Sequence, residues 1–263
     1  MYKYTDYPEN KLSARLKLSY KWLPENSDKI LDGGCSYGYG TRFFRLKSKE
    51  TYGIDSDENQ ISVAKLRYPD IHFKVSRLES TSFESEFFDV IILNDVLEHT
   101  TDKIKSLSES FRILKTNGLI IISTPHKGLF TFLDPYNYGY LLRTKFSKNY
   151  NFLYNIIYRI KKGIKPVQVN PAHLVKHFHY SLNELKSMLD LSDFKDKYII
   201  EKVFRSGLFM EVFTMNCESI LNIIFAKKVT RIILKPFAFL SNLDYWIRYG
   251  IFSYNIAIKV KKI

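Results

Sequence analysis

Cysteine and long apolar runs are scarce in this sequence. The 263 residues include two cysteines, Cys35 and Cys217, too few for the disulfide framework of a small secreted domain, and the simplest interpretation is a reducing, cytoplasmic setting. The N-terminal stretch MYKYTDYPENKL has no apolar core behind a basic start, so we expect no signal peptide. No apolar run reaches the roughly 18 residues of a membrane-spanning helix.

Acidic residues are scarce in one half of the chain only. Residues 1–140 contain 19 Lys and Arg and 19 Asp and Glu, whereas residues 141–263 contain 21 and 8. The whole net charge of +13 therefore lies in the second half. This imbalance indicates an anionic partner, such as nucleic acid, a phosphorylated substrate or a membrane surface; a solvated basic face is the alternative.

Glycine is also sparse, but it is concentrated in one loop. Of 11 glycines, four lie in the stretch ILDGGCSYGYG at residues 30–40. Glycine costs backbone entropy, so a cluster indicates a sharp bend or a close approach to the backbone. The loop follows a short apolar run at 29–33 and precedes a helical pattern at 39–47.

Apolar runs and amphipathic stretches alternate through the first half, with no internal repeat and no low-complexity linker. We predict strands at 29–33, 51–55, 71–76, 87–93 and 119–124. We predict helices at 10–22, 39–47, 57–68 and 101–115, with Asp57 as an N-cap and Gly118 as an end signal of the last helix. This order and the nearly all-apolar strands indicate a parallel sheet covered by helices on both faces.

The pattern changes after Pro125. Residues 126–180 are aromatic and basic, and 141–162 read as one or two helices. We predict a helix at 181–189, a strand at 198–204, helical structure at 218–240 and a closing strand at 254–261. We accordingly divide the chain into residues 1–125, 126–217 and 218–263.

Two acids frame the glycine loop. Asp32 stands directly before it, and Asp55 ends the next predicted strand. Ligands of open α/β sheets bind beyond the carboxyl ends of the strands, where an acid accepts hydrogen bonds from ribose hydroxyls. The pair indicates a nucleoside-containing cofactor. A dinucleotide fingerprint fits poorly, because Phe43 stands where the third small residue belongs and Ser36 breaks the other register.

Several linked motifs resemble those of class I S-adenosylmethionine-dependent methyltransferases, over roughly residues 28–125. DGGCSYG (32–38) resembles the first motif, GIDSDENQISVAK (53–65) the second, FFDVIILNDVLEH (87–99) the fourth and LIIISTP (119–125) the fifth strand. The resemblance is strongest to the type 11/12-like group, with ubiquinone-pathway and other small-molecule O-methyltransferases. It implies a doubly wound, Rossmann-like, seven-stranded and mostly parallel sheet with an antiparallel last strand, plus inserted and C-terminal helices.

The resemblance also implies roles for individual residues. Asp32 would hold the methionine amino group of the cofactor S-adenosyl-L-methionine and Asp55 its ribose. The remaining implied cofactor-binding residues are Gly34, Ser36, Gly38, Ser56, Leu78 and Asn94. Ser36 replaces a glycine of the family and needs a backbone angle that serine adopts. Arg77 stands where an acid often recognises adenine, so that contact is lost or passes to Glu79.

The segment Asp95–His99 carries the candidate catalytic groups. An oxygen acceptor needs a base for its proton, and a histidine near neutrality suits that task. We therefore predict His99 and Glu98 as catalytic residues. Two alternatives remain. Asp95, Glu98 and His99 match a metal-binding spacing of some relatives, or Glu98 and His99 satisfy backbone groups.

The second half would shape the acceptor pocket. Aromatic residues cluster at 130–140, and His173 and His177 are further pocket candidates. We assign no metal, because no cysteine or acid at suitable spacing completes a zinc site with these histidines. Residues 220–250 mix apolar runs with Lys227, Lys228 and Arg231 and can lie at a membrane interface.

The sequence therefore predicts a cytoplasmic methyltransferase that acts on an oxygen of a small molecule or lipid-linked glycan, with peripheral contact to the inner membrane face. Three alternatives stay open: an RNA methyltransferase, a nicotinamide dehydrogenase and a non-catalytic cofactor-binding module.

Overall fold

The computed structural model describes residues 12, 14–145, 152, 155–156, 159 and 177–263, which fall into two compact units. Unit 1 comprises the described parts of Met1–Thr124, Leu182–Phe204 and Ala257–Ile263. Unit 2 comprises those of Pro125–Ser181 and Arg205–Ile256. Each unit is discontinuous in sequence, unlike the three consecutive stretches 1–125, 126–217 and 218–263 expected from the sequence. Both cysteines are free thiols.

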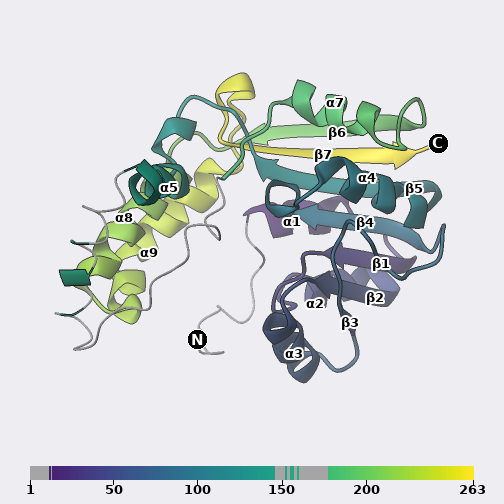
Figure 1. Ribbon diagram of the computed structural model, residues 1–263, viewed down its shortest axis with the longest axis horizontal. Helices are drawn as coiled ribbons and strands as arrows, with labels where there is room; N and C mark the ends of the chain where they lie inside the picture. The colour runs from purple at the N-terminus through teal and green to yellow at the C-terminus, as the bar shows by residue number, and fades with distance from the viewer. Residues whose placement is uncertain (1–11, 13, 146–151, 153–154, 157–158, 160–176) are drawn as a thin grey trace. The chain divides into compact units, whose positions relative to one another are not determined.

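A seven-stranded sheet forms the centre of unit 1 (Figure 1). Its strands are β1 (Ser27–Gly33), β2 (Ser48–Asp55), β3 (His72–Val75), β4 (Phe88–Asn94), β5 (Leu114–Pro125), β6 (Tyr198–Ser206) and β7 (Asn255–Lys262). Their order is β3-β2-β1-β4-β5-β7-β6. The five strands from β3 to β5 pair in parallel, and the arrow of β7 points the opposite way in Figure 1. The predicted fold class is confirmed.

The register of the central strands brings their carboxyl ends to one edge. Asp32 in β1 lies opposite Gly53 in β2 and Ile92 in β4. Asp55 and Asn94 end their own strands two residues further on. Polar side chains from three neighbouring strands therefore meet where a doubly wound sheet places its ligand.

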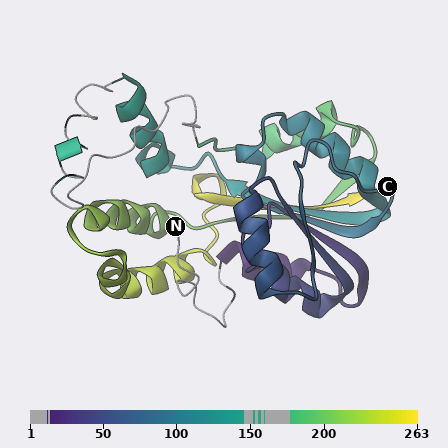
Figure 2. The same ribbon diagram turned by 60° about the horizontal axis from the view of Figure 1, so that its bottom comes forward.

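Helices cover both faces of this sheet. They are α1 (Ala14–Trp22), α2 (Thr41–Phe44), α3 (Glu58–Arg67), α4 (Lys103–Ile113) and α7 (Leu182–Leu191). Figure 2 shows α4 and α7, in teal and green, on one side and the purple to navy helices on the other. One face of β1, β4 and β5 buries Ile30, Ile92 and Ile121 against Phe44, with Leu16 and Tyr20 of α1 packed on them.

Of the two helix-end signals predicted from the sequence, the N-cap at Asp57 is confirmed and the end signal at Gly118 is not. Asp57 Oδ1 accepts hydrogen bonds from the N–H groups of Asn59 and Gln60, as expected of an N-cap. Gly118, predicted as the end signal of α4, instead lies inside β5, which begins directly after α4. A Cβ at Gly118 would lie 2.7 Å from the Lys115 carbonyl oxygen, so this glycine serves a tight bend within the strand.

Unit 2 is largely helical where it is described. Its helices are α5 (Pro135–Lys145), α8 (Met210–Ile224) and α9 (Lys227–Asp244), with short 3-10 turns at Thr131–Leu133 and Gly250–Phe252. The predicted helical stretch 218–240 falls on α8 and α9, which break at Phe225 and Ala226. Of the predicted helical stretch 141–162, residues 141–145 fall in α5, and most of the remainder lies outside the described residues. Among described residues, no helix has both the length and the apolar character needed to cross a bilayer.

The end of α9 holds the start of α8. The buried Asp244 Oδ2 accepts hydrogen bonds from the backbone N–H groups of Leu208, Phe209 and Met210, at 2.9, 3.2 and 3.1 Å. A carboxylate at a helix N-terminus satisfies otherwise unpaired donors and interacts favourably with the helix dipole. Asp244 thus ties the two helices of unit 2 together.

We expect the Asp244→Ala substitution to lower the free energy of unfolding of unit 2 by about 2 kcal/mol, because it leaves three partly buried backbone donors without their acceptor. Urea unfolding in a Trp22→Phe background follows this unit through Trp246. Glu218→Ala, at an exposed acid of α8, is the matched control and should shift the midpoint little. Equal midpoints for the two variants would contradict the capping role.

Candidate functional site

The glycine loop is fastened to β2 by its own backbone. The N–H groups of Gly34 and Cys35 both donate to the Ile54 carbonyl oxygen, at 2.8 and 2.9 Å. The loop needs left-handed angles at three positions: Gly34 (φ +72°), Ser36 (φ +49°) and Gly38 (φ +75°). Ser36, which stands where the resembled family has a glycine, therefore adopts the left-handed backbone conformation that this position requires.

Close packing explains two of these glycines. A Cβ at Gly34 would lie 2.5 Å from Val96 Cγ2, and one at Gly38 would lie 2.6 Å from Phe73 Cζ. The resemblance to methyltransferases implies that both glycines let a cofactor approach the backbone. In the structure, the contacts of the protein with itself already exclude a side chain at each position.

Asp55 joins the loop to the turn before α3. Its Oδ2 accepts a hydrogen bond from the Ser36 N–H at 2.9 Å, and its Oδ1 accepts one from the Asp57 N–H at 3.0 Å. A carboxylate has about four lone-pair sites, so each oxygen retains capacity for a ligand hydroxyl. The two protein hydrogen bonds hold the half-buried carboxylate in a fixed orientation.

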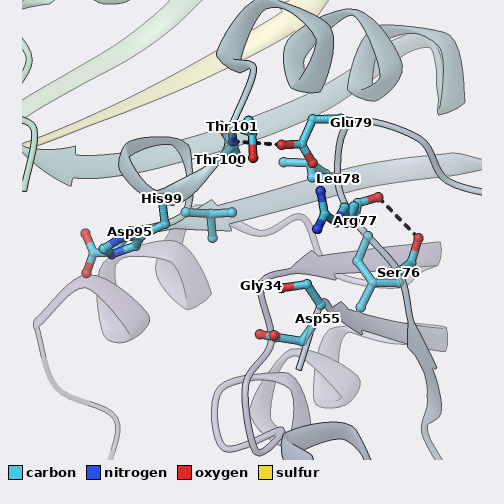
Figure 3. A pocket seen from close by; sticks show the side chains of 13 residues that line it. Gly34, Asp55, Ser76, Arg77, Leu78, Glu79, Asp95, His99, Thr100 and Thr101 are labelled. Atoms are coloured by element: carbon cyan, nitrogen blue, oxygen red, sulfur yellow. Dashed lines mark hydrogen bonds between the residues drawn. The ribbon is translucent and has the colours of Figure 1, made fainter. Parts of the chain in front are cut away.

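A cavity of about 280 Å³ opens beside Asp55 (Figure 3). Four predicted cofactor-binding residues, Gly34, Asp55, Ser56 and Leu78, are part of its lining. The other lining residues are Ile54, Ser76, Arg77, Glu79, Asp95, Val96, His99, Thr100 and Thr101. The cavity thus combines apolar walls from Ile54, Leu78 and Val96 with polar groups at its rim, the composition of a small-molecule site.

The outer wall of this cavity is held by Glu79. Its Oε1 accepts a hydrogen bond from the Thr101 N–H at 2.8 Å, drawn in Figure 3. One carboxylate oxygen of Glu79 is therefore used to fix the segment that leads into α4. The prediction that Glu79 replaces an adenine-recognising acid at Arg77 stays a prediction.

A second cavity, of about 190 Å³, shares Gly34 with the first. It is lined by Leu16, Asp32, Gly34, Cys35, Ser36, Tyr37, Tyr39, Gly40 and Asn94. Asn94 Oδ1 accepts hydrogen bonds from the hydroxyls of Ser19 and Ser123, at 2.8 and 2.9 Å. Asn94 Nδ2 is buried with no hydrogen-bond partner, a costly arrangement unless a ligand supplies an acceptor.

The second cavity also contains the carboxyl group of Asp32, which can accept a hydrogen bond from a ligand. Burial raises its pKa to about 7, with a smaller contribution from the charge of Asp55 and against a 2.6 Å hydrogen bond from the Thr41 hydroxyl. A buried carboxyl poised near neutrality, beside an unpartnered amide donor, suits a ligand that carries both a cation and an anion.

His99 and Glu98 occupy different environments. His99, in the 3-10 turn η3 (Leu97–His99), is exposed and lines the first cavity. Glu98 is buried and contributes to neither cavity lining; one of its oxygens accepts a hydrogen bond from the Thr124 hydroxyl at 3.1 Å. Burial and then the nearby charge of Asp95 raise the pKa of Glu98.

The spacing of Asp95, Glu98 and His99 suggested a metal set as one alternative. Asp95 has a left-handed φ of +53° and forms an ion pair with Arg15 of α1, at 3.0 Å. Asp95 is already paired with an arginine, and the raised pKa of Glu98 favours its protonated form, so both are poor ligands for a cation. The geometry therefore favours His99 as the chemically active member of this segment.

Unit 2 contains a polar cluster that sequence reasoning missed. Asp134 Oδ2 lies 2.6 Å from His177 Nδ1 and 3.1 Å from both His179 Nε2 and the Tyr254 hydroxyl. Sequence spacing offered no acid for these histidines, whereas the structure brings Asp134 to His177 and His179. Asp134 stands 43 residues before His177, a separation at which sequence spacing carries no signal. His173 lies outside the described residues.

Among the described residues of unit 2, the side chains of Asp134, His177 and His179 lie close enough together to hold a metal ion. Burial alone would raise the pKa of Asp134, but the hydrogen bond with His177 and the close contact with His179 outweigh it and hold the pKa below its usual range. The Tyr136 N–H also donates to Asp134 Oδ1. Because the carboxylate is already surrounded by donors, the cluster acts as a buried network that fixes the start of α5.

Comparisons with known proteins agree with this geometry. Residues 31–122 match the model of a family described as a methyltransferase domain. A Mycolicibacterium smegmatis protein named "Probable S-adenosylmethionine-dependent methyltransferase" is 29% identical over 102 residues, 39% of this chain and 40% of that protein. The ubiquinone biosynthesis O-methyltransferase of Pelagibacter ubique is 31% identical over 127 residues, 47% of this chain and 52% of that protein.

The chain thus spans about half the length, or less, of these curated relatives. Among solved structures, a SAM-dependent methyltransferase from Thermotoga maritima superposes with a TM-score of 0.55 at 15% identity, over 95% of this chain and 88% of that one. That likeness shows the fold alone. Residues 31–122 thus match a methyltransferase domain, and the relative from Mycolicibacterium smegmatis is named as dependent on S-adenosylmethionine.

Proposed function

We propose that this chain transfers the methyl group of S-adenosyl-L-methionine to an oxygen atom of a small molecule or a lipid-linked glycan. The observation that carries the proposal is the pair of adjoining cavities at the carboxyl edge of the sheet. One holds the fixed carboxylate of Asp55, and the other holds Asp32 beside the unpartnered amide of Asn94.

The residues present fit the two ends of the cofactor. Asp55 has lone pairs to accept from ribose hydroxyls, between the apolar Leu78 and Val96. Asp32 offers a carboxylate to the amino group of the methionine moiety, and Asn94 Nδ2 offers a donor to its carboxylate. The cofactor supplies an electrophilic methyl group on a sulfonium, and the main tasks of the protein are alignment and exclusion of water.

His99 is the base that the geometry favours. Its imidazole is exposed at the rim of the first cavity, where an acceptor hydroxyl can reach it. Glu98 is buried, and its raised pKa favours the protonated form, so it is poorly suited to accept a proton at neutral pH. We retain Glu98, whose side chain is buried within η3, as a positioning residue for His99.

Oxygen as the accepting atom is supported by relatives named as O-methyltransferases of ubiquinone biosynthesis. We place the protein in the cytoplasm, where the cofactor and reduced cysteines are both expected. The test is incubation with methyl-labelled cofactor and separate lipid, small-molecule and RNA fractions. Label in the lipid or small-molecule fraction supports the proposal, and label in RNA alone, with binding that weakens steeply with salt, would replace it.

Asp55→Ala should weaken cofactor affinity about 100-fold, because two charge-assisted hydrogen bonds to the ribose are lost. Isothermal titration calorimetry measures the affinity. Asp55→Asn keeps an oxygen that can accept from the Ser36 N–H. It therefore distinguishes a loss of ribose binding from a disturbed conformation of the glycine loop. Asp70→Ala, at an exposed acid paired with Arg45, is the control. Unchanged affinity in Asp55→Ala would remove the ribose assignment.

Cofactor binding should depend on pH through Asp32. With a pKa of about 7 in the free protein, the carboxyl is protonated at lower pH and must lose its proton to pair with an ammonium group. Affinity should therefore fall up to about tenfold per pH unit below 7 and level off above it. Calorimetry between pH 5.5 and 8.5 tests this, and Asp32→Asn should bind weakly with no such dependence. A flat wild-type profile contradicts the role.

His99→Gln should leave cofactor affinity unchanged while lowering kcat by about 100-fold or more, because only proton removal from the acceptor is affected. The readout is label transfer to the acceptor fraction, with cofactor affinity measured on the same sample. Turnover at the wild-type rate would show that His99 is not the base.

A further inference from the structure

Helix α9 of unit 2 carries a second, exposed apolar row. One face of the helix is buried through Thr230 and Leu234. A different row of large apolar side chains is exposed by 41 to 66%: Val229, Ile232, Ile233, Phe239, Leu240 and Leu243. At 100° per residue these six lie within about 120° of one another, on the side of the helix next to the buried face. We call them the apolar row.

A basic row runs beside the apolar row. Lys227, Lys228, Arg231 and Lys235 are exposed and recur at helical spacing. At 100° per residue, one edge of the apolar row borders the buried face, and the basic row borders the other edge. Around the circumference of α9, the buried face is therefore followed by the apolar row and then by the basic row.

Acids are missing from the exposed surface of this helix. The single acid of α9, Asp244, is buried and caps α8. Unit 2 as a whole contains 15 Lys and Arg against four Asp and Glu, by the sequence of its segments. One of those acids, Asp134, is buried, and Glu211 accepts a hydrogen bond from Asn255. An occupant of this surface must therefore be apolar at its centre and anionic at its edge.

Helix α8, which packs against α9 (Figure 1), also carries exposed apolar side chains at its C-terminal end. Ile220 and Ile224 are 58 and 65% exposed, and Phe225 at the break between the helices is 40% exposed. An extended apolar surface of this kind on a monomer marks a docking site. A second copy of the chain would bring one strongly basic surface against another, which like-charge repulsion disfavours.

We propose that the apolar row of α9, with Ile220 and Ile224 of α8, docks unit 2 onto the surface of a membrane that carries anionic headgroups. The apolar side chains enter the boundary between headgroups and acyl chains, and the basic row lies at the level of the phosphates. This is the geometry of a helix that lies in the interface plane. The inference concerns unit 2 alone and holds whether or not the chain transfers methyl groups.

Vesicle flotation of the full chain, without cofactor or acceptor, tests the proposal. Vesicles of phosphatidylglycerol with phosphatidylcholine should carry the protein upward, and vesicles of phosphatidylcholine alone should carry much less. A variant with Ile232→Ser, Phe239→Ser and Leu243→Ser should bind at least tenfold more weakly. Lys228→Gln with Lys235→Gln should lose about fivefold per lysine, and high salt should reproduce that loss.

Matched controls come from α3 of unit 1. Leu66 is 85% exposed and Lys65 is exposed, so Leu66→Ser and Lys65→Gln change similar side chains away from α9. Both control variants should float like wild type, and circular dichroism shows whether each variant is folded. Absent flotation, or equal flotation of the row variants and the controls, would overturn the proposal. So would a dimer in light scattering that the apolar-row variant abolishes, since the occupant would then be a second copy.

Discussion

The hydrogen bonds that tie the glycine loop to β2 determine the rest of the site. Ile54 accepts from two consecutive loop N–H groups, and the Asp55 carboxylate accepts from the third, at Ser36. Three donors in a row can point at one strand end only if the loop adopts left-handed angles, which Gly34 and Ser36 provide. The same bonds leave Asp32 on one side of Gly34 and Asp55 on the other, each in its own cavity.

The site retains polar groups at a cost to stability. Asp32 and Glu98 are buried carboxyls whose ionisation is disfavoured, and Asn94 has a buried donor with no partner. Such groups are rare in protein interiors because each costs free energy on folding. Asn94 and Asp32 line the same cavity, where a ligand of opposite polarity can satisfy both. Glu98 lines neither cavity; its buried side chain lies within η3 and accepts a hydrogen bond from the Thr124 hydroxyl.

Local patterns predicted the sheet, because its strands are apolar throughout and its helices are amphipathic or capped, as at Asp57. They also predicted that Asp32, Asp55 and His99 lie at one edge, since the carboxyl ends of parallel strands coincide. Tertiary packing decided the rest. Gly118 looked like the end of a helix but serves a bend in β5. Asp134 meets His177 and His179 only because chain segments far apart in sequence come together. The exposed row of α9 became visible only when its buried face was known.

We expect the two adjoining cavities to accept an adenosyl sulfonium amino acid rather than another nucleoside cofactor. Calorimetric titration of the wild-type chain with S-adenosyl-L-methionine, its demethylated product and NAD, in parallel, tests this most directly. We expect saturable one-to-one binding of the first two ligands and no binding of NAD. Tight binding of NAD, or no heat with either adenosyl ligand under conditions where the chain is folded, would contradict it.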